Sequence, residues 1–93
     1  MEKNYLKRVL ENEERVNKLV EVLAISPTSH YQVEYGRFEI SLSAFANTKD
    51  DAQQIENLMR IFASSTDKME MQALDSERGK FWIIGLAIPL DED

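Results

Sequence analysis

Apolar residues in the first quarter of the chain recur with the three- and four-residue spacing of an α-helix. The resulting stripe consists of Leu6, Val9, Val16, Val20 and Leu23. Glu13 takes the place between Val9 and Val16, and neither Gly nor Pro interrupts the segment. Pro27 disfavours helical geometry at the preceding residue, so we expect the helix to end there. The pattern predicts a long amphipathic N-terminal helix within residues 1–25.

Two later stretches alternate apolar and polar residues with the period of two that indicates β-strands. In the first stretch, residues 31–35 and 38–44 flank Gly36, which suits the turn of a hairpin. By this alternation we expect Tyr31, Tyr35 and Phe38 on the buried face of the hairpin. In the second stretch, residues 69–73 and 81–88 flank a turn in which Gly79 takes the left-handed position.

A second helix is predicted between the two hairpins, within residues 47–65. Thr48 is suited to cap its first turn, with Asp51 three residues later as in a capping box. Asp50 and Asp51 fall where the positive end of the helix dipole favours carboxylates. The expected buried stripe consists of Ala52, Ile55, Leu58, Met59 and Phe62.

The predicted order of elements is therefore α-β-β-α-β-β. Because the strands come in hairpins, we expect a four-stranded, largely antiparallel sheet with two helices, which belongs to the α+β class. A length of 93 residues corresponds to one domain, so residues 1–93 form a single small domain whose acidic tail is residues 91–93.

The strand predicted at residues 81–88 is apolar on both of its faces. One face carries Trp82, Ile84, Leu86 and Ile88, which we expect in the core. The other carries Phe81, Ile83, Gly85 and Ala87. If this strand neighbours the strand that holds Ser41 and Ser43, this second face is flat, with little side-chain bulk, so another backbone can approach it closely. Three alternatives remain open for what packs on this second face: the first helix, a second copy of the chain, or a different protein.

The chain carries a net charge of −6, and its sequence places that charge after residue 25. The first 25 residues hold five acids and five bases, whereas the remainder holds twelve acids and six bases. An acidic surface disfavours nucleic acid and anionic membranes, since both require Lys and Arg. We therefore expect no direct nucleic-acid or membrane binding. The N-terminal segment has no apolar signal region, so the sequence predicts a cytoplasmic location.

No grouping of residues in the sequence points to catalysis, a metal or a cofactor. Cysteine is absent, and the three glycines form no phosphate-binding loop. Asp50–Asp51 and Asp91–Asp93 lack the ligand spacing of a calcium loop. His30 is the single histidine, and we expect it to be a surface residue in a turn. We predict that the protein is not an enzyme.

The leading hypothesis is a small acidic protein-binding module that occupies a basic, nucleic-acid-binding surface of a larger partner protein. Its size, acidity and lack of cysteine resemble inhibitors and accessory proteins of phages and mobile elements. The residues expected to contact the partner are Glu34, Glu39, Glu70, Asp75, Glu77, Asp91, Glu92 and Asp93.

Two alternatives stay open beside this hypothesis. One is a self-assembling structural protein, a homodimer or higher oligomer, whose interface is either the helix stripe Leu6, Val9, Val16, Val20 and Leu23 or the sheet face Phe81, Ile83, Gly85 and Ala87. The other is a small-ligand binder or enzyme that uses His30.

Overall fold

A computed structural model describes residues 2–28 and 30–90, with side chains described from residue 6 onward. The predicted order of elements is confirmed, and so is the α+β class. The elements are α1 (Glu2–Ile25), β1 (His30–Tyr35), β2 (Glu39–Ala46), α2 (Lys49–Phe62), β3 (Lys68–Ser76) and β4 (Gly79–Pro89). Neither described helix is both long and apolar enough to span a membrane.

Both predicted turn and cap signals are found where the sequence placed them. The hydroxyl oxygen of Thr48 accepts a hydrogen bond from the amide of Asp51 at 3.1 Å, so Thr48 is the N-cap of α2. Gly79 has a φ of 122°, a conformation that disfavours any residue with a Cβ atom. It lies at the turn that joins β3 to β4, which fixes the register of that hairpin.

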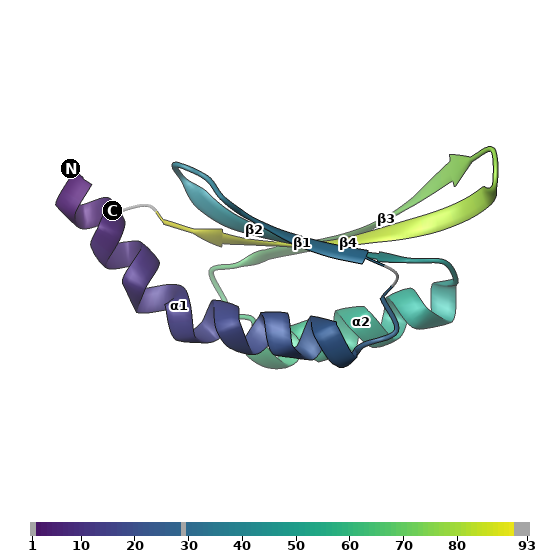
Figure 1. Cartoon of the computed structure of the whole chain (residues 1–93), viewed down its shortest axis with the longest axis horizontal. Helices are drawn as coiled ribbons and strands as arrows, with labels where there is room; N and C mark the ends of the chain where they lie inside the picture. The colour runs from purple at the N-terminus through teal and green to yellow at the C-terminus, as the bar shows by residue number, and fades with distance from the viewer. Residues whose placement is uncertain (1, 29, 91–93) are drawn as a thin grey trace.

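The four strands form one antiparallel sheet in the order β1-β2-β4-β3. The central strands are therefore β2 and β4, and the predicted neighbourhood of their small residues is confirmed: Ser43 lies opposite Gly85, and Ser41 lies opposite Ala87. The strands bend along their length, so the sheet is concave on one side and convex on the other (Figure 1). The second face of β4, which was expected to be flat, is therefore curved.

Both helices pack on the convex side of the sheet, side by side (Figure 1). The core lies between them and the even-numbered residues of the two central strands, among them Ile40, Leu42, Ile84 and Leu86. From the helices, Leu19, Leu23, Ile55 and Met59 are fully buried. The first cover considered for the second face of β4 is therefore wrong, because α1 lies on the same side as α2.

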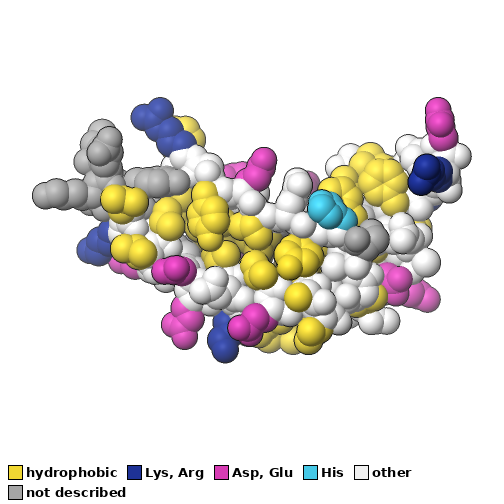
Figure 2. Space-filling model, in the orientation of Figure 1, with side chains coloured by type: hydrophobic (Ala, Val, Ile, Leu, Met, Phe, Trp, Pro, Cys, Tyr) yellow, Lys and Arg dark blue, Asp and Glu magenta, His cyan; other side chains and the backbone are white. Residues whose placement is uncertain are grey.

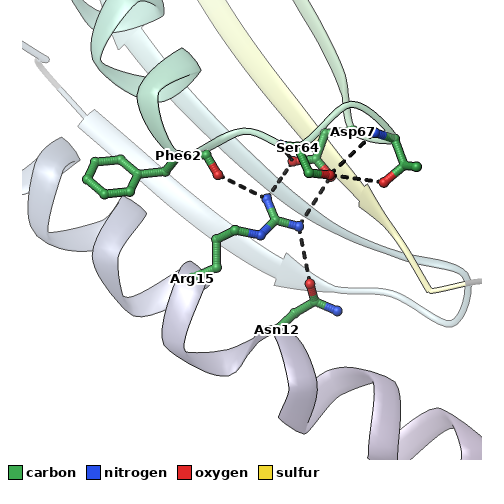
Figure 3. A network of polar contacts seen from close by, with 6 residues as sticks. Asn12, Arg15, Phe62, Ser64 and Asp67 are labelled. Atoms are coloured by element: carbon green, nitrogen blue, oxygen red, sulfur yellow. Dashed lines mark hydrogen bonds and ion pairs between the residues drawn. The ribbon is translucent and has the colours of Figure 1, made fainter.

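A polar network fixes α1 to the segment between α2 and β3 (Figure 3). The guanidinium of Arg15 donates to both carboxylate oxygens of Asp67, and to the carbonyl oxygen of Phe62 at 3.3 Å. The same carboxylate accepts hydrogen bonds from the amide and the hydroxyl of Ser64. The Asp67 side chain is 1% exposed, so this ion pair belongs to the framework of the fold.

Three aromatic residues differ from expectation in their burial. Phe38 was predicted on the buried face but lies in the turn between β1 and β2, 68% exposed, with the guanidinium of Arg37 stacked 5.6 Å from its ring centre. Tyr35 has the predicted orientation but is 53% exposed, because β1 is an edge strand. Trp82 packs against the core and is only partly buried, whereas Ile84, Leu86 and Ile88 are buried as predicted.

Candidate functional site

The concave side of the sheet is covered by neither helix (Figure 1), and we call it the open face. It consists of the odd-numbered residues of β2 and β4 and the even-numbered residues of β1 and β3, as the strand registers show. Because the strands are antiparallel, these residues form rows across the sheet, and the central rows run across all four strands. The rows differ in character from one end of the sheet to the other.

The end of the open face nearest the turn between β3 and β4 is apolar and aromatic. The ring centres of His30 and Phe45 are 5.5 Å apart, and those of Phe45 and Phe81 are 6.4 Å apart. Ile83 lies directly opposite Phe45 on the neighbouring strand, and Leu74 lies opposite Phe81. Apart from the exposed His30, these side chains are partly exposed, although their composition would suit a core.

The middle of the open face has a floor of small residues. Here Gln32, Ser43, Gly85 and Glu70 form one row across the four strands. A Cβ atom placed on Gly85 would meet no atom within 4 Å, so the space above this glycine is empty. A shallow hollow of about 500 Å³ lies over this region and is lined by residues of β2, β3 and β4.

Acidic residues lie at two places on the open face, namely the end next to the turn between β1 and β2, and the edge strand β3. Glu34, Glu39 and Glu70 all belong to the open face, and Lys68 is the one lysine or arginine among its described residues. Glu39 accepts a hydrogen bond from the hydroxyl of Ser41 at 3.2 Å, and all three glutamates are exposed. Figure 2 shows the upper outline of the molecule dipping between the hydrophobic cluster beside the histidine and acidic side chains on the other side.

The structure thus places three of the eight residues predicted to contact a partner on the open face. Asp75 and Glu77 are exposed at the far end of the hairpin formed by β3 and β4, away from the hollow. Asp91, Glu92 and Asp93 lie outside the described residues.

The residues predicted for self-assembly fall into two groups. Val16 and Leu23 of the helix stripe are buried in the core of their own chain, and Val9 and Val20 pack against it. Leu6 is 57% exposed, and with Leu10 it lines a shallow hollow on the N-terminal part of α1. The sheet group, Phe81, Ile83, Gly85 and Ala87, lies wholly on the open face.

His30 lies at the start of β1, with its ring exposed. Among the described residues, no hydrogen bond joins its imidazole to an acid or a hydroxyl. The hydroxyl of the nearby Thr28 contacts the backbone of His30 and Phe45 instead. Within the described part of the chain, no three residues of the metal-binding types lie close enough together to hold an ion.

Sequence reasoning missed how Phe45, His30 and Lys68 contribute to this surface. The signal was present in the alternation, since Phe45 has the same parity as Ser41 and Ser43. The strand order was needed before His30 and Phe81 could be placed on either side of Phe45.

Comparisons with protein-family models, with curated proteins and with solved structures found no match to this chain.

Proposed function

We propose that this chain is a non-enzymatic protein-binding module, and that the open face of its sheet contacts the partner. The observation that carries the proposal is that both helices pack on one side of the sheet (Figure 1). Phe45, Phe81 and Ile83 are consequently left partly exposed on the other side. Apolar groups that gather on a surface, bordered by polar residues, are typical of protein interaction sites.

The charge of the open face supports a partner with a basic surface. Three carboxylates face one lysine among the described residues of this face. Lys and Arg on the partner would complement these carboxylates, raise the association rate and make it sensitive to salt. A surface that normally holds nucleic acid is rich in Lys and Arg, so the proposed partners include proteins of that class.

Affinity capture with matched variants tests this function. The wild-type chain is compared with Gly85→Trp, which fills the hollow, and with Glu34→Gln/Glu39→Gln/Glu70→Gln. The control variants are Gln54→Trp and Glu13→Gln/Glu14→Gln/Glu21→Gln. They introduce the same residue types at exposed positions of the helices. We expect a captured protein to be lost from both open-face variants, kept by both controls and released at high salt. Equal capture by all five proteins would refute the proposal.

Self-assembly is a second candidate, favoured by the exposed Leu6 and Leu10 on α1. Both residues belong to the N-terminal half of α1, and the N-terminal end of this helix projects beyond the sheet (Figure 1). Leu6→Glu/Leu10→Glu should dissociate an oligomer formed through this part of the helix. Sedimentation of the wild-type chain as a monomer at high concentration would exclude this function.

A further inference from the structure

The curvature of the sheet gives the open face the shape of a trough that runs across the strands. Its floor is the row that contains Ser43 and Gly85, which add little bulk. One wall is the aromatic cluster of Phe45 and Phe81, and the other is the end that carries Glu34 and Glu39. The trough therefore has an apolar side and an acidic side, facing each other across an empty floor.

The dimensions of the trough fit one α-helix. Four strands spaced about 4.8 Å apart make a trough roughly 15–20 Å long, which corresponds to about 10–13 helical residues. From Glu39 to Phe45 the strand advances six residues, or about 20 Å, which admits a helix about 10 Å wide. Gly85 lies near the middle of this span, where a helix would approach the sheet most closely.

Backbone hydrogen bonding distinguishes a helix from an extended peptide in this position. The hydrogen bonds of a sheet lie in its plane, so its face offers no backbone partners to a chain that rests on it. An extended segment in the trough would bury its own N–H and C=O groups without partners, which costs free energy. A helix satisfies these groups internally, so it can occupy the trough without that cost.

The charges of the trough also disfavour a second copy as its occupant. Two open faces placed against each other would each bring a net charge of −2 from Glu34, Glu39, Glu70 and Lys68. Like charges brought together at an interface oppose association. A helix with Lys or Arg on one flank would instead place its cations beside the glutamates.

We propose that the occupant of this trough is a basic amphipathic helix of a partner protein. The large aliphatic residues of this helix, such as Leu, pack against Phe45, Phe81 and Ile83. Small residues of the helix contact the floor at Ser43 and Gly85, and its Lys or Arg residues contact the glutamates. This inference rests on the proposed function and adds the chemistry and the conformation of the partner segment.

A synthetic helix serves as the probe. It is a peptide of about 14 residues with capped termini. Its Leu, Ala and Lys residues lie on three successive faces of the helix. Two control peptides carry Glu in place of Lys, or one Pro in place of a central Ala, which breaks the helix. Binding to the full chain is measured by calorimetry, and the helicity of the bound peptide by circular dichroism.

We expect the Lys peptide to bind with a stoichiometry of one and to gain helicity on binding. Both control peptides should bind at least about tenfold more weakly, a difference of about 1.4 kcal/mol. Gly85→Trp and Glu34→Gln/Glu39→Gln/Glu70→Gln should weaken the binding of the Lys peptide by a similar factor. Gln54→Trp should leave its binding unchanged. Gly85→Leu serves as a smaller block if the tryptophan variant fails to fold.

Three results would overturn the inference. Equal binding of the Pro peptide would mean that the occupant is not a helix, while leaving the proposed function intact. Unchanged binding by Gly85→Trp would place the peptide elsewhere on the molecule, and a lack of any binding would remove the helix from consideration. The proposed function fails by a different result, namely a captured protein that open-face variants retain as well as the wild type does.

Discussion

At the scale of single residues, Asp67 and Gly85 show how differently two positions of this chain are constrained. The carboxylate of Asp67 is buried and accepts hydrogen bonds from Arg15 and Ser64. Gly85 has empty space above it and no positive φ, so nothing in the fold requires a glycine there. The first residue holds the helix layer in place, whereas the second keeps the floor of the trough low.

Removal of the Asp67 carboxylate should destabilise the fold markedly. In Asp67→Ala the amide of Ser64 loses its acceptor, and the part-buried guanidinium of Arg15 keeps only the oxygens of Phe62 and Asn12. We expect the free energy of unfolding to fall by about 2–3 kcal/mol, less than for a fully buried pair because the Arg15 side chain is 24% exposed. Urea denaturation measures the loss.

Glu56→Ala is the matched control, because it breaks an ion pair within α2 between Glu56 and Arg60, whose side chain is 61% exposed. That pair should contribute no more than about 0.5 kcal/mol. Equal losses in the two variants would mean that the Arg15–Asp67 network does not hold α1 in place.

At the scale of elements, the period of the apolar pattern predicted both helices and the strands of both hairpins. The turns and the cap at Thr48 followed from the positions of Gly36 and Gly79 and from the capping-box spacing of Thr48 and Asp51. The pattern predicted the burial of individual residues within those elements less accurately. The expectation for Phe38 failed because alternation holds only inside a strand, and this residue lies in the turn before β2. The pattern also could not say which side of the sheet α1 covers, since a helical stripe packs equally well against either apolar face.

The edge strands carried a signal that would have decided that question. Gln32, Glu34 and Glu70 share the second face with Gly85 and Ala87 once the register is known. An apolar helix stripe placed over these residues would bury polar groups without partners, at a cost in free energy. This constraint cannot be seen in the sequence of β4 alone, because the polar residues of the open face lie on the neighbouring strands.

Neighbouring residues of β4 should respond to substitution in opposite ways. Ile84 is fully buried, so Ile84→Ala should lower the free energy of unfolding by about 2–4 kcal/mol. Gly85→Val should cause no loss, and a gain of up to about 1 kcal/mol is expected from the strand preference of valine. Thermal and urea unfolding would measure both. A large loss in Gly85→Val would mean that the open face is covered in the free protein.

At the scale of the whole molecule, the fold has two layers, and the helix layer covers one side of the sheet and leaves the other side uncovered. The helix layer buries its apolar stripe against the convex side of the sheet, and an ion pair fixes it there (Figures 1 and 3). The concave side has aromatic residues at one end, small residues in the middle, and glutamates at the other end and on the β3 edge, and neither helix covers it. This asymmetry directs the search for a partner to one surface.

Self-association through the open face is not expected, because its carboxylates would repel those of a second copy. The sedimentation coefficient of Gly85→Trp should therefore equal that of the wild-type chain over a wide range of protein concentration. Analytical ultracentrifugation provides the comparison. A wild-type dimer that Gly85→Trp converts into a monomer would show that the partner is another copy of the chain.

The most direct test of the open face as the binding surface is a map of backbone amide chemical shifts by nuclear magnetic resonance. The labelled chain is titrated with the Lys-rich helical peptide described above. We predict saturable shift changes at Ser43, Phe45, Ile83 and Gly85, with the amides of exposed α2 residues such as Gln54 unchanged. Changes confined to the helix layer, or spread evenly over the acidic residues of the whole chain, would contradict the claim.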